Sequence, residues 1–162
     1  MVASSALLFH HESATRKTID RNNHRVFCRK WSEYLFKKLL RDKIEKNYFF
    51  TDKKLGILLV GDSDFGKFED SAKDIVDYCK NNDYEVKVNL DIDDLNVGGK
   101  TDIVISFTED YDIRNIRARG NIIRILVSDE DLSGDLGYDI LIADEDNLNE
   151  AIFSELYGKY LD

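Results

Sequence analysis

The chain has 162 residues, of which 43% are hydrophobic and 34% charged, and its formal net charge is −9. This composition excludes a disordered chain, and without a run of about 18 apolar residues we expect no membrane-spanning helix. An acidic chain repels phosphates, so we expect no nucleic-acid partner. Cys28 and Cys79 lie far apart without the spacing of metal ligands, and we interpret them as reduced thiols of a cytoplasmic protein.

The charge is distributed unevenly along the chain. Residues 1–54 contain 13 Lys and Arg against 6 Asp and Glu, a balance of +7. Residues 55–162 contain 10 Lys and Arg against 26 Asp and Glu, a balance of −16. A break of this size favours two units of different role, so we predict a basic N-terminal domain over 1–54 and an acidic domain over 55–162.

A dense polar motif follows the first apolar run. Ala6–Phe9 predicts a short strand, and His10, His11, Glu12 and Arg16 come soon after it. A neutral imidazole suits a divalent transition metal, and a planar guanidinium suits a diphosphate. Neighbouring residues on a strand point to opposite faces, so at most one of the two histidines would enter such a site. Two interpretations stay open at this point: a ligand site, or a strand end with structural hydrogen bonds.

The basic segment 22–46 predicts a long helix. Its apolar residues recur at nearly every fourth position, which is typical of one helical face. We expect that face to pack against the rest of the chain while the basic residues face solvent. An anionic membrane surface is the alternative partner, because a basic helix is attracted to it. The apolar positions are Phe27, Trp31, Leu35, Leu39 and, with a slip of register, Ile44.

From Leu55 onwards, strand patterns alternate with helical patterns. Leu55–Gly61 is a continuous apolar run, as expected for a parallel strand that is buried on both faces. The alternation predicts an α/β fold, with a doubly wound, mostly parallel, five-stranded Rossmann-like sheet preceded by the N-terminal strand and the long basic helix. Further strands are predicted over 84–90, 102–107, 121–127 and 138–143, and helices over 67–82, 113–119 and 146–160.

Polar residues follow the predicted strands. Open parallel sheets bind ligands beyond the carboxyl ends of their strands, where the strand order reverses. The residues that we expect to line such a cleft are Asp62, Ser63 and Asp64 after the first strand, and Thr108 and Glu109 after the third. The carboxylates suit a divalent cation, but surface turns also prefer Asp, and both interpretations stay open. The same carboxylates argue against a phosphate cradle in the first loop.

The acidic pair after the first strand resembles the one found in receiver domains. Those domains need an aspartate at the end of the third strand, where this chain has Ser106 and Phe107, and a lysine after the fifth, where it has Asp144. Phosphorelay chemistry is therefore not expected, although the architecture would be similar. An alternative function for such a domain is that of a non-catalytic protein-interaction module, which would dock a partner or form a homodimer through the 22–46 helix.

Residues 3–35 resemble the end of the catalytic domain in bacterial family 2 glycosyltransferases. Those GT-A domains close with an apolar strand, a His-His-Glu-Ser-x-(Ser/Thr)-Arg stretch and a helix with a Phe…(Lys/Arg)-Trp signature, which correspond here to residues 6–16 and 27–31. The resemblance implies that His10 binds the metal, Mn or Mg, and that His11 and Arg16 lie at the diphosphate. It also implies that the nucleotide-binding strand, the Asp-x-Asp motif and the catalytic base precede this motif. We therefore expect no catalytic residue in this chain and no activity of the chain alone.

Residues 55–160 resemble the N-terminal Rossmann-like domain of GT-B glycosyltransferases that follow family 2 domains in some polysaccharide-assembly proteins. The similarity lies in residues 101–107, 111–114, 122–125 and 137–143, whereas Val127–Glu130 stands where that family has a tryptophan-rich stretch. The resemblance implies a nucleotide sugar and a glycan acceptor as partners. Together, the two resemblances imply a fragment of a glycosyltransferase of cell-surface polysaccharide synthesis, located in the cytoplasm at the inner face of the membrane.

Overall fold

The computed structural model describes residues 21–91, 100–108, 121–129, 137–143 and 147–161. By their contacts the residues fall into two compact units, Met1–Phe36 and Lys37–Asp162. The second half of the basic helix therefore belongs to the same unit as the α/β sheet. The boundary between the units lies at residues 36 and 37, whereas the charge balance changes at residues 54 and 55. The predicted strand at 6–9 and the predicted helix at 113–119 lie outside the described residues.

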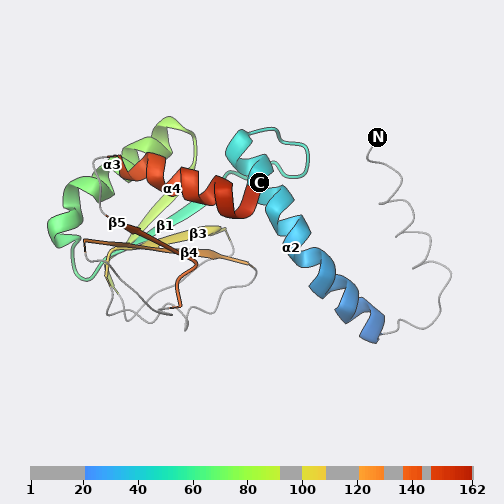
Figure 1. The fold of residues 1–162 in the computed structure, drawn as a ribbon. Helices are drawn as coiled ribbons and strands as arrows, with labels where there is room; N and C mark the ends of the chain where they lie inside the picture. The colour runs from blue at the N-terminus through green and yellow to red at the C-terminus, as the bar shows by residue number, and fades with distance from the viewer. Residues whose placement is uncertain (1–20, 92–99, 109–120, 130–136, 144–146, 162) are drawn as a thin grey trace. The chain divides into compact units, whose positions relative to one another are not determined.

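Five strands form one sheet in the order β2-β1-β3-β4-β5, and all neighbours are parallel (Figure 1). The α/β fold with a five-stranded parallel sheet is thereby confirmed. One strand is added on one side of β1 and three on the other, so the winding reverses at β1, as in flavodoxin-like doubly wound sheets. The strands are β1 (Gly56–Val60), β2 (Glu85–Asn89), β3 (Ile103–Ser106), β4 (Ile123–Ser128) and β5 (Ile140–Ala143).

The burial of each strand follows its place in the sheet. β1 and β3 are buried along their whole length and β4 nearly so, since both faces of a central parallel strand are covered. β2, at one edge, is mostly exposed, and β5, at the other edge, alternates between buried and exposed residues. Each buried Leu or Ile side chain stabilises the fold by about 1.5–3 kcal/mol. The central strands therefore provide most of the core.

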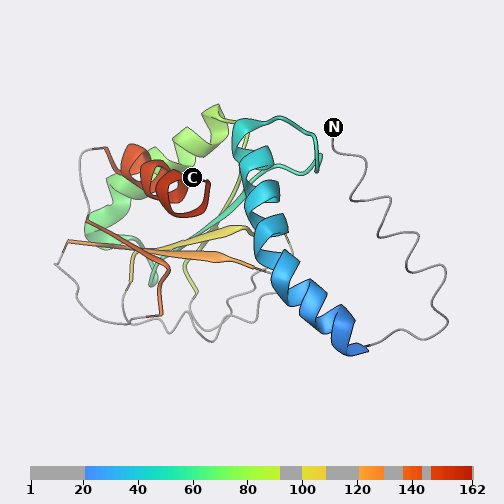
Figure 2. The same cartoon turned by 45° about the vertical axis from the view of Figure 1, so that its right-hand side comes forward.

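Two helices lie side by side over one face of the sheet (Figures 1 and 2). The 3-10 turn η1 (Gly66–Phe68) leads into α3 (Glu69–Asn81), and α4 (Leu148–Leu156) continues into the π-helical turn η3 (Tyr157–Leu161). Buried residues on each helix recur three or four positions apart, as on a single helical face. They are Ala72, Ile75 and Cys79 on α3, and Leu148, Ile152 and Leu156 on α4.

Cys79 is a free thiol in the core beneath α3. Desolvation by burial raises its pKa to about 11, so the thiol stays protonated and unreactive at neutral pH. The prediction of a reduced thiol is confirmed for Cys79, whereas the side chain of Cys28 lies outside the described part of the chain.

The helix α2 (Arg21–Glu45) occupies the predicted helical segment, but its packing face differs from the predicted one. Leu39 is 38% exposed, whereas Leu40 is only 2% exposed and Ile44 is also buried. The expectation that Leu39 packs against the rest of the chain is therefore wrong, whereas the expectation for Ile44 is confirmed. The reason is geometrical. A helix has 3.6 residues per turn, so residues four apart are rotated by about 40° relative to each other. A long row of apolar residues at this spacing therefore leaves the face of the helix on which it began.

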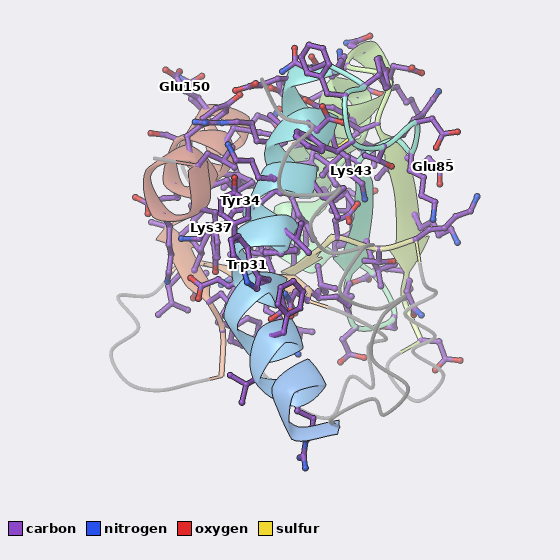
Figure 3. The ribbon with its side chains drawn as sticks, turned by 90° about the vertical axis from the view of Figure 1, so that its right-hand side faces the viewer. Trp31, Tyr34, Lys37, Lys43, Glu85 and Glu150 are labelled. Carbon is purple, nitrogen blue, oxygen red and sulfur yellow. The ribbon has the colours of Figure 1, made fainter. Side chains whose placement is uncertain are left out.

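The end of α2 is fastened to the amino-terminal edge of the sheet. Lys43, labelled in Figure 3, has its Nζ 2.6 and 2.7 Å from the two carboxylate oxygens of Asp102, which immediately precedes β3. Asp102 Oδ2 also accepts a hydrogen bond of 2.9 Å from the N–H of Gly56, the first residue of β1. The hydroxyl of Tyr84, just before β2, donates to the carbonyl of Ile44 at 3.2 Å. The helix thus joins the starts of three strands, at the edge opposite their carboxyl ends.

Asp42 is a buried carboxylate that holds the turn after α2. It is 3% exposed, and its two oxygens accept hydrogen bonds from the N–H groups of Phe49, Phe50 and Thr51 at 2.9, 3.0 and 3.1 Å. Desolvation raises the pKa of Asp42, but the three donors outweigh it and hold the pKa below its ordinary value of 3.8. A lowered pKa means that the carboxylate stabilises the fold above about pH 4 and that this stabilisation is lost as the pH falls further.

We expect Asp42→Asn to lower the melting temperature at pH 7, because an amide offers one uncharged acceptor oxygen to three N–H groups. The difference between wild type and variant should shrink as the pH falls from about 5 to 2, where the wild-type carboxylate becomes protonated. Circular-dichroism melts at several pH values measure this, with the exposed Asp52→Asn as control. A difference that does not change with pH would contradict the assigned role.

Candidate functional site

The carboxyl ends of β1 and β3 form the switch point of the sheet. β2 pairs with one side of β1 and β3 with the other, and in open α/β sheets this reversal leaves a crevice beyond the strand ends. Asp62, Ser63 and Asp64 follow β1 at this edge, and Thr108 follows β3. The other predicted site residues, His10, His11, Arg16 and Glu109, lie outside the described residues.

The loop after β1 is held to the end of β2 by main-chain hydrogen bonds. The N–H of Gly61 donates to the carbonyl of Asn89, and the N–H of Ser63 to that of Leu90, both at 3.0 Å. Ser63 has a φ of 57°, in the left-handed region, so the chain turns sharply there. The three polar residues 62–64 are consequently exposed at the tip of a loop whose base is fastened to the sheet.

Asp64 takes part in the turn that follows. Its Oδ1 accepts a hydrogen bond of 2.9 Å from the N–H of Gly66, which has a φ of 52° that glycine adopts without strain. The space before this turn is also tight, because a Cβ on Gly61 would lie 2.6 Å from the carbonyl oxygen of Asp64. Asp64 therefore has the turn role that was one of the two open interpretations, and one carboxylate oxygen makes that bond.

Aromatic rings join the two loops beneath the polar tip. The centroids of Phe65 and Phe107 lie 5.3 Å apart in an edge-on arrangement, and Phe107 lies 5.6 Å from Phe68. The N–H of Phe107 donates to the carbonyl of Val60 at 3.0 Å, which fixes the end of β3 against β1. Because Phe107 and Phe68 are buried and Phe65 is half-buried, the rings give the strand-end edge an apolar base.

An ion pair at this edge connects the loop after β1 with the end of β4. Lys67, in η1, pairs with Asp129, and the hydrogen bond from Lys67 lowers the pKa of Asp129 below its ordinary value. Both side chains are at least half exposed, so water screens the pair and its contribution to stability is small. Its effect on the site is to place one cation among several carboxylates. No local pattern predicts the pair, because its members are far apart in the sequence.

Hydroxyl groups fix the position of Thr108 at the end of β3. The buried Ser106 donates from its hydroxyl to the carbonyl of Thr108 at 2.9 Å, and the N–H of Thr108 lies 3.4 Å from the same oxygen. The hydroxyl of Tyr138 donates to that carbonyl as well, at 3.3 Å. Ser106 thus stands at the end of β3, where phosphorelay chemistry would need a carboxylate.

The described edge offers three exposed carboxylates, two hydroxyl side chains and one lysine, which pairs with Asp129, above an apolar base. Groups of this kind bind a ligand rich in hydroxyls through donated and accepted hydrogen bonds. Within the described ranges, no three His, Cys, Asp or Glu side chains are grouped as metal ligands would be. In the same part of the chain, no helix has the length and apolar character needed to cross a membrane.

Comparisons of the chain with protein-family models, with curated proteins and with solved structures find no match.

Proposed function

We propose that this chain is part of a bacterial glycosyltransferase of cell-surface polysaccharide synthesis, in which the α/β domain binds the glycan acceptor. The observation that carries the proposal is the set of polar side chains at the switch point: the exposed Asp62, Ser63 and Asp64 after β1, and the half-buried Thr108 after β3. Carboxylates and hydroxyls above the half-buried ring of Phe65 suit a sugar, which has hydroxyls along its edges and an apolar ring face.

The sequence resemblance supports the same proposal from the other end of the chain. In family 2 enzymes the stretch that corresponds to His10, His11 and Arg16 lies at the metal and diphosphate of the nucleotide sugar. We assign these three residues to that site within a larger enzyme, with Mn or Mg as the metal. The described residues contain no group of three His, Cys, Asp or Glu side chains that could hold a metal. Sugar transfer is assigned to a domain outside it, and the proposed place of action is the cytoplasmic face of the membrane.

Calorimetric titration of the full chain tests the proposal. We expect hexasaccharides such as chitohexaose, cellohexaose or maltohexaose to bind, and UDP- and GDP-sugars, with or without manganese, not to bind tightly. The double variant Asp62→Asn, Asp64→Asn should weaken glycan binding roughly tenfold, since each site loses charged acceptors. Asn retains an oxygen for the N–H of Gly66, so the turn is preserved.

The control variant is Asp70→Asn, whose side chain is fully exposed on α3. It should leave glycan affinity unchanged. Equal binding by wild type and by the Asp62, Asp64 double variant would overturn the assigned site. Sugar transfer by the chain alone would overturn the claim that it is inactive without a further domain.

A protein-interaction module is the second candidate function, and the strand order favours it. The order β2-β1-β3-β4-β5 and the acidic pair after β1 are those of receiver-type sheets, while Ser106 and Phe107 stand where the phosphoacceptor would be. If no oligosaccharide binds in the titration, and the chain takes up no phosphate from acetyl phosphate, the module becomes the better assignment.

A further inference from the structure

A groove of about 760 Å³ lies between α3 and α4, on the helical face of the sheet and apart from the strand-end site. The two helices run side by side (Figures 1 and 2), and Asn149 Nδ2 donates across them to the carbonyl of Asp74 at 3.4 Å. The residues that line the groove come from α3, from the start and middle of α4, and from Tyr157 of η3.

The lining of the groove combines carboxylates with aromatic rings. None of the described residues that line it is a Lys, Arg or His, although Lys80 beside the groove lies 3.7 Å from Asp77 at the surface. The rings of Tyr78 and Phe153 face each other with centroids 5.0 Å apart. Such a surface suits a ligand that is both cationic and aromatic. The carboxylates belong to Asp74, Asp77 and Glu150, and the rings to Tyr78, Phe153 and Tyr157 (Figure 3 labels Glu150).

The N-terminal half of α2 has the complementary chemistry. Phe27, Trp31, Tyr34 and Leu35 recur at helical spacing, and we call them the aromatic stripe. Neighbouring ring centroids lie 5.8 Å apart for Phe27 and Trp31, and 5.5 Å apart for Trp31 and Tyr34. Trp31 is 40% and Tyr34 51% exposed. Figure 3 labels both side chains on α2. A row of large apolar side chains this exposed marks an interaction surface more often than a solvated one.

The helix segment that carries the aromatic stripe also matches the groove in charge and in length. Residues 21–38 contain six Lys and Arg and one Glu, a balance of +5, and this segment therefore attracts the acidic lining. At 1.5 Å per residue, residues 21–36 extend about 24 Å, close to the roughly 20 Å of α3. The segment up to Phe36 also forms a compact unit separate from the sheet unit. Separate units of one chain are the elements that two copies can exchange.

We propose that the groove of one chain receives the aromatic stripe of a second copy, so that two chains form a reciprocal dimer. Each dimer then contains two helix-to-groove contacts, which raises the buried surface toward the about 1,200 Å² that a stable interface needs. The contact uses α2, α3, α4 and Tyr157 of η3, and none of these lies in the loops of the strand-end site, so dimerisation is independent of the strand-end ligand.

Sedimentation equilibrium of the full chain at about 1–100 µM tests this inference, together with the emission of Trp31, the only tryptophan. The wild type should dimerise, and the emission should shift to shorter wavelength as the dimer forms. One variant reverses the groove charge, Asp74→Lys with Glu150→Lys, and the other reverses the charge at positions three or four residues from members of the stripe, Lys30→Glu with Lys38→Glu. Each should weaken dimerisation by roughly a hundredfold.

The decisive arm mixes the two charge-reversed variants in equal amounts. Each helix then faces a groove of opposite charge, so the mixture should form a heterodimer although neither variant dimerises alone. The control is Asp70→Lys, outside the groove lining, which should dimerise as the wild type does. Circular dichroism of each variant, and the recovery of dimer on mixing, separate a lost contact from a lost fold.

Several results would overturn the proposal. They include a wild type that stays monomeric over the whole range, a dimer that survives either charge reversal, and a mixture that fails to associate. A monomer whose Trp31 emission responds to reversal of the groove charge would place the stripe in the groove of its own chain. A monomer that binds phosphatidylserine vesicles would assign the stripe to a lipid surface. Both of these results would show that the second copy is not the occupant.

Discussion

Gly56→Ala is expected to lower the free energy of unfolding by about 3 kcal/mol or more. A Cβ at this first position of β1 would lie 1.8 Å from the carbonyl oxygen of Lys100 and 3.3 Å from the Cα of Thr101. Both are main-chain atoms, so no side chain can rotate away, and the strand and the segment before β3 must separate. That separation strains two further bonds, from the N–H of Gly56 to Asp102 and from the N–H of Asp102 to the carbonyl of Gly56.

Chemical denaturation with urea, followed by circular dichroism, measures the effect of Gly56→Ala. The matched control is Gly158→Ala in η3, where an added Cβ would meet nothing within 4 Å. The control should lie within about 1 kcal/mol of wild type. For a chain of this size the Gly56 variant should also melt roughly 6–12 °C lower. Equal stability of the two variants would show that the close approach of Gly56 and Lys100 does not limit the sheet.

Lys43→Met is expected to have the second large effect, a loss of about 3 kcal/mol. The Lys43 and Asp102 side chains are only 12% and 18% exposed, so removal of the ammonium leaves a largely buried carboxylate without its cation. Asp102 keeps the hydrogen bond from the N–H of Gly56, which does not compensate the charge. The loss should therefore exceed what a surface ion pair contributes.

A double-mutant cycle isolates this ion pair. Asp102→Asn should also destabilise, but the double variant Lys43→Met, Asp102→Asn should be more stable than the sum of the single losses predicts, by about 1–3 kcal/mol. Lys54→Met serves as the control, since Lys54 and Asp83 form an exposed pair and its removal should leave the melting temperature nearly unchanged. Additive effects of the two substitutions would mean that Lys43 and Asp102 are not coupled.

Local patterns in the sequence were sufficient to predict the strands and helices that the structure describes in the α/β unit. The continuous apolar run from Leu55 to Gly61 predicted a strand buried on both faces, and β1 is such a strand. The alternating residues 84–90 predicted a strand, and β2 is one, although it lies mostly exposed at an edge. The strand order itself could not be predicted, because it depends on contacts between segments distant in the sequence. The reversal at β1, which creates the candidate site, depends on that order.

In the candidate site, too, local features were predicted from the sequence and contacts between distant residues were not. Asp62, Ser63, Asp64 and Thr108 were predicted from their positions after strands, and these four residues lie at one edge of the sheet. The pairing of Lys67 with Asp129 was not predicted, since it joins η1 to the end of β4. The buried face of α2 was mispredicted because a four-residue step drifts around a helix, so that Leu40 rather than Leu39 is buried.

The most direct test of the proposed function is amide chemical-shift mapping of the full chain during titration with the best-binding hexasaccharide. If the switch point binds the glycan, the largest shifts should occur at residues 61–67 and 106–108, on the two loops that meet at the ends of β1 and β3. They should be strongly reduced in the Asp62→Asn, Asp64→Asn variant. Shifts confined to α3 and α4, or equal shifts in wild type and variant, would contradict the account.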